Sequence, residues 1–263
     1  MPYLVGMGID ITEQKQTEEA LIKSEEKFRE AYNRANFYKD LFAHDMSNIL
    51  QNIQLSVELL SLNQKKPRKR EEIDKFIRII EKQINRGAKL ILNVRYLTEI
   101  EETEISIKSI KVYEVLKRTT EYIINSYQDR KLNIQIDSNG KEFYAKANEL
   151  LREVFENILI NAVKYNTNST VEILIKISKY QEKGINYVKL EIIDNGMGIP
   201  DEKKEKLFLR TTRIDRSSTR MGLGLSLVKK IIEKYNGKIW IENKVQGDYL
   251  KGSNFIFIIP EAV

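Results

Sequence analysis

The sequence predicts a fold in two parts, a long helical hairpin followed by a two-layer α/β sandwich with a mixed sheet. Between Ile9 and Arg86 there is no glycine, and Pro67 is the only proline in that stretch. Glycine and proline are the costly residues inside a helix, so this stretch favours long helices joined by one turn at Pro67. After Thr103 strand-like and helix-like runs alternate along the chain. That alternation is typical of helices packed on a sheet.

The composition excludes several kinds of site. The 263 residues include no cysteine and one histidine, so disulfides, zinc–thiolate sites and histidine-based metal clusters are excluded. No run of about 18 apolar residues is present and the N-terminus lacks the order of a signal peptide, so we expect a cytoplasmic protein with no membrane segment in this chain. The 44 basic and 38 acidic residues are interspersed, which argues against a nucleic-acid partner.

The segment that precedes the hairpin is predicted to be a dimeric helix. Residues 1–12 are predicted to form a short strand, too small to fold alone, which we interpret as the tail of another domain. Residues 13–41 then carry a weak heptad repeat that includes Leu21, Phe28 and Ala35. A single helix would leave this stripe in water, so we expect a parallel coiled coil in a homodimer. One amphipathic helix packed on a missing domain is the alternative.

Residues 42–101 are predicted to form the hairpin itself. Apolar residues recur at three- and four-residue steps in a first arm from Phe42 to Leu60 and in a second arm from about Glu71 to Thr98. Two hairpins of this kind would associate as a four-helix bundle in the dimer.

The first arm carries His44, the only histidine of the chain. Asn48 and Gln51 follow at positions i+4 and i+7, so the three side chains are neighbours on one polar face of the helix. A neutral imidazole is a nucleophile near pH 7, because its ordinary pKa is about 6.5. From this segment alone, a surface histidine beside a polar neighbour is the simpler interpretation.

The second part is predicted to contain six strands and three helices. The predicted strands span residues 105–110, 132–136, 171–178, 187–193, 239–242 and 255–259, and the predicted helices span residues 112–127, 149–165 and 223–235. Gln181–Gly184 is predicted to be the turn of a hairpin between the third and fourth of these strands.

The predicted helix 149–165 carries a first set of residues that suit a nucleotide. Asn157, Asn161 and Lys164 share one face of this helix, and Tyr165 follows them. Amide oxygens suit a magnesium ion that keeps most of its waters, and a tyrosine ring can cover a base. By itself this set could equally be an ordinary polar helix face.

Two further motifs lie at the end of a strand and at the start of a helix. Asp194 continues the apolar side of strand 187–193, so its carboxylate should point into the sandwich, where an adenine amino group could be its partner. Gly196 and Gly198 allow a ligand to approach the backbone. Backbone N–H groups of the segment Gly222–Gly224 could bind phosphate. Residues 201–221, between the two motifs, suit a mobile lid. Each motif alone could be a structural turn.

Taken in order, these motifs resemble the sequence boxes of the sensor histidine kinases of two-component systems. Residues 42–50 resemble the H box of that family, 157–165 the N box, 194–199 the G1 box, 207–208 with 213–215 the F box, and 222–225 the G2 box. Residues 8–15 resemble the end of a PAS sensor domain. The resemblance implies a PAS remnant over 1–12, a signalling coiled-coil helix over 13–41, a dimerisation and histidine phosphotransfer hairpin over 42–101, and a Bergerat-type ATP-binding domain over 102–263.

The same resemblance implies an ATP-dependent protein histidine kinase. His44 would accept the γ-phosphoryl group with Asp45 as general base, and the group would then pass to an aspartate of a response regulator receiver domain. Asn48 would serve in removing phosphate from that regulator, and Asn161 would hold Mg²⁺. The remaining members of the ATP site would be Asn157, Lys164, Tyr165, Asp194, Gly196, Gly198, Gly222, Leu223 and Gly224.

The chain departs from the family pattern in three places. Ile49 stands where the H box usually has proline, so no kink is expected there. Thr211 and Thr212 replace the second aromatic residue of the F box, and the segment Thr219–Met221 offers less glycine than the G2 box usually has.

Two other functions are compatible with the same motifs. One is a non-catalytic signalling scaffold that binds nucleotide, and the other is a Bergerat-fold ATPase. ATPases of that fold carry a glutamate four residues before the magnesium asparagine, where this chain has Asn157.

Overall fold

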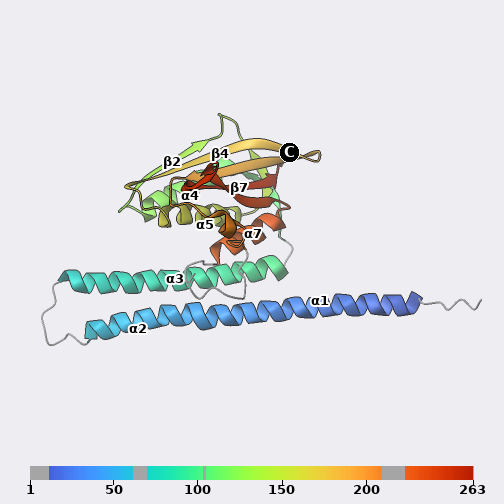
Figure 1. Cartoon of the computed structure of the whole chain (residues 1–263), viewed down its shortest axis with the longest axis horizontal. Helices are drawn as coiled ribbons and strands as arrows, with labels where there is room; N and C mark the ends of the chain where they lie inside the picture. The colour runs from blue at the N-terminus through green and yellow to red at the C-terminus, as the bar shows by residue number, and fades with distance from the viewer. Residues whose placement is uncertain (1–11, 62–69, 103–104, 209–222, 263) are drawn as a thin grey trace, which may run out of the picture. The chain divides into compact units, whose positions relative to one another are not determined.

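Figure 1 shows the computed structural model of the chain, which describes residues 12–61, 70–102, 105–208 and 223–262. The chain divides into two compact units, residues 1–89 and 90–263, and the division falls inside a long helix. The predicted turn at Pro67 and nearly all of the predicted strand over 1–12 lie outside the described residues.

The first unit is helical, as the absence of glycine and proline predicts. Helix α1 spans Thr12–Leu41, a short π-helix (η1) spans Phe42–Met46, and α2 spans Ser47–Ser61. Helix α3 spans Arg70–Glu102 and continues into the second unit. The second predicted arm is therefore confirmed and is longer at its C-terminal end. None of the helices within the described ranges combines the length and hydrophobicity that a membrane span requires.

Helices α2 and α3 approach each other closely where Ile49 meets Gly87. Ile49 is almost fully buried, and a Cβ atom at position 87 would lie 3.7 Å from its Cγ2 atom. That distance is ordinary van der Waals contact, so a Cβ atom at position 87 would fit against Ile49.

The second unit contains two sheets and four helices among the described residues. Its elements in chain order are β1 (Lys108–Lys111), α4 (Val112–Ser126), β2 (Lys131–Asp137), β3 (Tyr144–Ala147), α5 (Leu151–Lys164), β4 (Thr170–Glu182), β5 (Ile185–Asp194), α6 (Asp201–Lys204), α7 (Gly224–Lys234), β6 (Lys238–Val245) and β7 (Asp248–Pro260). The large sheet has the order β2-β4-β5-β7-β6, and β1 pairs with β3 in a small antiparallel sheet.

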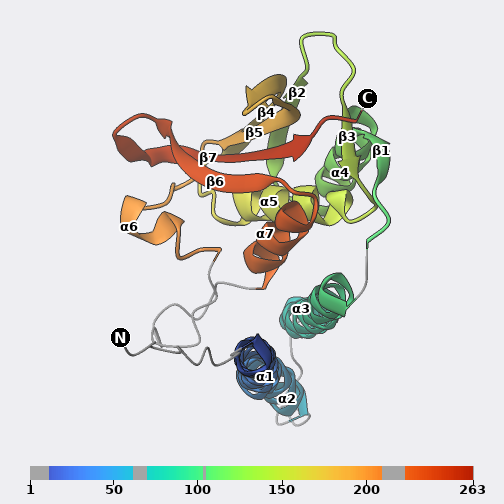
Figure 2. The same cartoon turned by 90° about the vertical axis from the view of Figure 1, so that its right-hand side faces the viewer.

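The large sheet is mixed, because β2 runs parallel to β4 while the other neighbours are antiparallel. Helices α4, α5 and α7 lie on one face of it (Figure 2). The core lies between these layers, where the rings of Phe155 on α5 and Phe257 on β7 have centroids 5.9 Å apart. The predicted fold, a helical region followed by a two-layer α/β sandwich, is confirmed.

The predicted hairpin turn is confirmed and is tighter than Gln181–Gly184. Strand β4 continues to Glu182 and β5 begins at Ile185, so two residues form the loop. Both have positive φ, 49° at Lys183 and 79° at Gly184, which is the conformation of a type I′ turn. Strand β3 was not predicted, and β6 and β7 are longer than predicted because they form a second hairpin.

Candidate functional site

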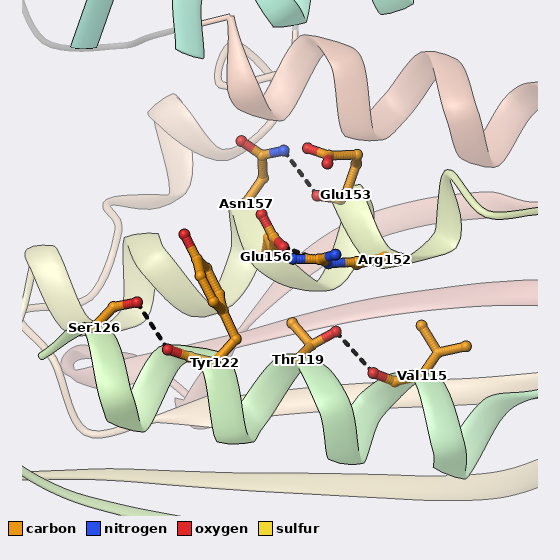
Figure 3. Close-up of polar contacts among 8 residues, drawn as sticks. All are labelled: Val115, Thr119, Tyr122, Ser126, Arg152, Glu153, Glu156 and Asn157. Carbon is orange, nitrogen blue, oxygen red and sulfur yellow. Dashed lines mark hydrogen bonds and ion pairs between the residues drawn. The ribbon is translucent and has the colours of Figure 1, made fainter. Parts of the chain in front are cut away.

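Helix α5 has two polar faces with different surroundings, and Figure 3 shows them in one view. Arg152 and Glu156 lie on the side that faces α4. Arg152 Nε is 2.7 Å from Glu156 Oε1, and its guanidinium lies 5.5 Å from the ring centroid of Tyr122. Glu153 and Asn157 lie on the opposite side of α5. The α4 side therefore holds a carboxylate that is already paired.

The side of α5 away from α4 brings Asn157 against the first turn of α7. Asn157 is buried, and its Nδ2 donates a hydrogen bond of 2.7 Å to the carbonyl oxygen of Glu153. That bond turns Oδ1 toward Gly224, where a Cβ atom would lie only 2.5 Å from it. Two segments predicted to bind nucleotide, 157–165 and 222–224, are thus in contact. Gly224 is required here because any side chain would collide with the amide.

Asp194 lies at the end of β5 and faces the interior, as its place in the alternating pattern predicts. Asp194 is 5% exposed to solvent. Oδ1 accepts hydrogen bonds from the backbone N–H of Gly196 at 2.7 Å and of Ser253 at 3.3 Å. Burial raises the pKa of this carboxyl above its usual value, and the two backbone N–H groups and Lys244 oppose that shift. Among the described residues both hydrogen bonds reach Oδ1, so Oδ2 is the oxygen left for a ligand.

The loop after Asp194 lies in close contact with two other segments, the end of α5 and the start of β7. The N–H of Met197 donates to the carbonyl oxygen of Tyr165 at 3.2 Å, which joins the loop to the end of α5. Gly198 has φ of +67°, and a Cβ atom there would lie 1.6 Å from the carbonyl oxygen of Tyr249. Glycine is therefore the residue this backbone requires at position 198.

The remaining predicted residues of α5 lie at its exposed end. Asn161 is half-buried, Lys164 is exposed, and Lys164 Nζ lies 5.2 Å from the ring centroid of Tyr165.

Leu223 is almost fully buried. Its side chain therefore packs in the core, and it could reach a ligand only through its backbone. Gly222 lies outside the described residues, as do Arg213–Asp215 of the predicted F box.

The predicted phosphate acceptor lies in the first unit, in the π-helix η1. The structure describes the backbone of His44 but not its side chain, while Asp45 and Asn48 are half-buried. The absence of proline at Ile49 predicts an unbroken helix, yet the hydrogen-bond pattern changes over Phe42–Met46. π-Helices are rare and occur frequently at functional sites, so this change of pattern marks the segment.

Sequence reasoning missed a group of asparagines beside the site. Asn166 Nδ2 donates to Asn195 Oδ1 at 2.6 Å, and Asn168 Nδ2 donates to the backbone oxygen of Asn195. Asn166 directly follows Tyr165, and Asn195 directly follows Asp194. Asn-Thr-Asn after a helix indicates a turn, but nothing in the sequence indicates that it would meet a segment 29 residues away.

Comparison with known proteins finds similarity to a described family and to two named kinases. Residues 146–263 match the family described as histidine kinase-, DNA gyrase B- and HSP90-like ATPase. The chain is 28% identical over 251 residues to the adaptive-response sensory kinase SasA of Crocosphaera subtropica, covering 91% of this chain and 63% of that protein. It is 37% identical over 115 residues to the sensor protein kinase WalK of Staphylococcus aureus, covering 42% of this chain and 26% of that protein. The chain therefore spans less than two thirds of the length of these relatives.

Two solved structures share the fold over most of the chain. Histidine kinase ThkA in complex with response regulator protein TrrA matches with a TM-score of 0.63 at 20% identity, covering 97% of this chain and 68% of that one. Acinetobacter baumannii histidine kinase AdeS matches with a TM-score of 0.58 at 16% identity, covering 84% and 98%.

Proposed function

We propose that the chain is an ATP-dependent protein histidine kinase, because residues 146–263 match the family described as histidine kinase-, DNA gyrase B- and HSP90-like ATPase and the chain as a whole is similar to sensor histidine kinases. His44 is the proposed acceptor of the γ-phosphoryl group and Asp45 its general base. An aspartate of a response regulator receiver domain is the proposed recipient, and Asn48 serves in a phosphatase reaction on that regulator. Because ATP is the proposed substrate, we expect a cytoplasmic location.

One observation carries this proposal. Helix α5, the end of β5 and the first turn of α7 are far apart in the sequence, yet Asn157 meets Gly224 and Tyr165 meets the loop after Asp194. Each of these segments was predicted independently to contact a nucleotide. An assembled site of this kind supports nucleotide binding more strongly than any of the three motifs alone.

The geometry of Asp194 supports a role in recognising adenine. Two backbone N–H groups hold Oδ1, and Oδ2 keeps its capacity to accept a hydrogen bond from an exocyclic amino group. The same carboxylate would repel the carbonyl that guanine carries at that position. A buried acceptor of this kind discriminates well, because a ligand without the matching donor leaves it unpaired.

Three residues of α5 fit a magnesium ion that is bound together with ATP, namely Asn157, Asn161 and Lys164. Asn161 is the proposed ligand, with Asn157 and Lys164 near the phosphates. Amide oxygens suit Mg²⁺, which binds proteins through few ligands and keeps several waters. When bound, the ion would neutralise charge on the phosphates during transfer. The chain's own contribution is to orient the phosphates and to hold Lys164 at the mouth of the site.

The surfaces of the helices support a homodimer through the helical bundle. Ile77, Ile84 and Ile91 are spaced by seven residues on α3 and are all exposed, Ile84 and Ile91 at 55%. We call these three residues the seam. Leu21 and Phe28, also seven residues apart, are exposed on α1. Apolar residues at this spacing form the contact surface of paired helices, so we infer that a second copy covers them.

Two further parts of the proposal come from the sequence. The boundaries 1–12, 13–41, 42–101 and 102–263 stay predictions for a PAS remnant, a signalling helix, a phosphotransfer hairpin and a catalytic domain. Asn157 agrees with a kinase rather than an ATPase, because it stands at the position, four residues before the magnesium asparagine, where ATPases of that fold carry a glutamate.

Incubation with γ-labelled ATP and Mg²⁺ tests the proposed function. We expect label on the protein that is acid-labile and base-stable, and that is lost in His44→Gln and in Asn161→Ala. Release of free phosphate without protein label would instead indicate the ATPase. Nucleotide binding with neither product would indicate the signalling scaffold.

A further inference from the structure

We propose that Asn166 and Asn195 form a clamp that fixes the spacing between Tyr165 and Asp194 and thereby sets the preference of the site for adenine over guanine. The inference rests on the proposed ATP site and adds two positioning residues to it. Neither asparagine is proposed to touch the nucleotide.

The side chain of Asn195 makes hydrogen bonds within the protein at both its oxygen and its nitrogen. Its Oδ1 accepts hydrogen bonds from Asn166 Nδ2 at 2.6 Å and from the N–H of Glu172 at 2.9 Å. Its Nδ2 donates to the carbonyl oxygen of Thr170 at 3.2 Å. Asn195 therefore ties the loop after β5 to the first residues of β4.

Asn166 is held just as firmly on the other side. It is 2% exposed, and its Oδ1 accepts the N–H of Asn168 at 3.0 Å. Its carbonyl oxygen accepts a hydrogen bond from Arg130 Nη2 at 2.9 Å. The loop after α5 is thus anchored to the segment that leads into β2. A hydrogen-bond network centred on a buried amide resists movement, because no member can move without losing a bond.

Each member of the clamp is the covalent neighbour of a proposed adenine contact. Asn166 follows Tyr165, and Asn195 follows Asp194. Between them, a Cβ atom at Gly196 would lie 2.9 Å from both Asp194 Oδ1 and the carbonyl oxygen of Tyr165, so the backbone of Gly196 lies close to the Asp194 side chain and to the backbone of Tyr165. The hydrogen bond between Asn166 and Asn195 joins the two loops beside this arrangement. Its loss allows Tyr165 and Asp194, the two proposed adenine contacts, to move apart.

The consequence should be specific to the base of the nucleotide. A hydrogen bond weakens steeply when its distance or angle is wrong, so a shift of Asp194 would weaken the bond to the adenine amino group. Among the proposed phosphate contacts, Asn157 and the first turn of α7 lie outside the clamp, and Lys164 precedes Asn166 by two residues. Loss of the clamp should therefore lower ATP affinity by about tenfold, the effect of one misplaced hydrogen bond, and should change GTP affinity little.

The test measures dissociation constants for ATP and GTP by calorimetry on the whole chain. The variants are Asn166→Ala, Asn195→Ala and the double variant, with melting temperatures recorded for all. Tyr235→Phe is the matched control, because it removes a buried hydrogen bond to Asn148 in the same unit without touching the clamp. We expect both single variants to lose about tenfold in the ATP-to-GTP preference and the double variant to lose no more, since the residues act as one unit.

The outcomes separate this inference from the proposed function. If the wild-type chain prefers ATP and both asparagine variants keep that preference, the clamp is overturned while the ATP site stands. An equal loss of preference in Tyr235→Phe also overturns it, because the effect would then follow stability alone. If the wild-type chain binds neither nucleotide, the ATP site itself fails and the clamp fails with it. Should an alanine variant unfold, Asn168→Ala takes its place. It removes the hydrogen bond from Asn168 Nδ2 to the backbone oxygen of Asn195 and must lower the ATP-to-GTP preference by roughly threefold.

Discussion

The two units of the chain differ in how completely each buries its own apolar surface. In the sandwich, side chains such as Leu116, Ile158 and Phe257 are fully buried between the helices and the sheet. In the hairpin, Ile49 is buried, while Leu50 and the seam residues on α3 are exposed. The sandwich therefore has a complete core, whereas the hairpin has the surface of half a bundle. This difference predicts that dimerisation belongs to the hairpin and nucleotide binding to the sandwich.

The largest expected effect is on dimerisation. In Ile84→Glu a charge replaces an apolar residue of the seam in both subunits at once. Burial of one isoleucine contributes about 1.5–3 kcal/mol, so the dimer should dissociate at a concentration higher by about a hundredfold or more. Analytical ultracentrifugation measures the change. Lys82→Glu, at an exposed position of the same helix outside the seam, is the control. An unchanged dimer in Ile84→Glu would show that the seam is not the interface.

The second effect belongs to the sandwich alone. Asp194→Asn replaces the charged acceptor of the proposed adenine bond with a neutral amide of the same shape. Hydrogen bonds to charged groups contribute about 1.5–3 kcal/mol, so ATP affinity should fall by about thirtyfold while the dimer is unaffected. Calorimetry gives the affinity, and Asp129→Asn in an exposed loop is the control. If ATP binding survives Asp194→Asn, this carboxylate is not the adenine contact.

A third prediction compares one glycine in each unit. Gly224→Ala places a Cβ atom 2.5 Å from Asn157 Oδ1 and should destabilise the sandwich by about 1–3 kcal/mol and weaken ATP binding by about tenfold. Gly87→Ala meets only Ile49 at 3.7 Å inside a helix and should stabilise the hairpin by about 0.5–1 kcal/mol. Thermal unfolding and calorimetry measure both. Opposite signs are expected. Unchanged stability in Gly224→Ala would contradict the close approach of α5 and α7, and destabilisation by Gly87→Ala would contradict the ordinary contact at Ile49.

The smallest effect is that of pH on nucleotide binding. Burial raises the pKa of Asp194 above the usual 3.8, so the folded protein binds this proton more tightly than the unfolded chain does. The ionised form is the one that accepts the adenine bond. ATP affinity should therefore fall by about twofold when pH is lowered to the raised pKa, at a pH where an ordinary aspartate is still mostly ionised. Titrations at several pH values measure this, and Asp194→Asn should flatten the dependence. A slope that persists in that variant would assign the effect to another group.

Sequence patterns predicted the elements whose residues are periodic over many positions. The strict alternation in Val188–Asp194 identified β5 and the inward direction of Asp194, and the stretch without glycine identified α1 to α3. Strand β3 was missed because four residues with flanking polar segments carry too short a pattern. These successes and failures follow from local periodicity, which is what a sequence displays directly.

The parts of the site that were missed depend on contacts between distant segments. Asn166 and Asn195 are 29 residues apart, and their pairing follows from the order of β4 and β5 in the sheet. The donation from Ser253 to Asp194 depends in the same way on the position of β7. The π-helix at Phe42–Met46 is a different case, because its residue types are compatible with an ordinary α-helix.

The central claim is that a nucleotide bound in the sandwich delivers its terminal phosphoryl group to the one imidazole of the hairpin. Mass spectrometry of the chain after incubation with ATP and Mg²⁺, with fragmentation of the peptide that contains His44, tests this claim most directly. The expected result is a phosphoryl group on the His44 ring in the wild-type chain and on no residue in His44→Gln. Phosphate on a serine, threonine or tyrosine, or an unmodified His44 in a chain that binds ATP, would contradict it.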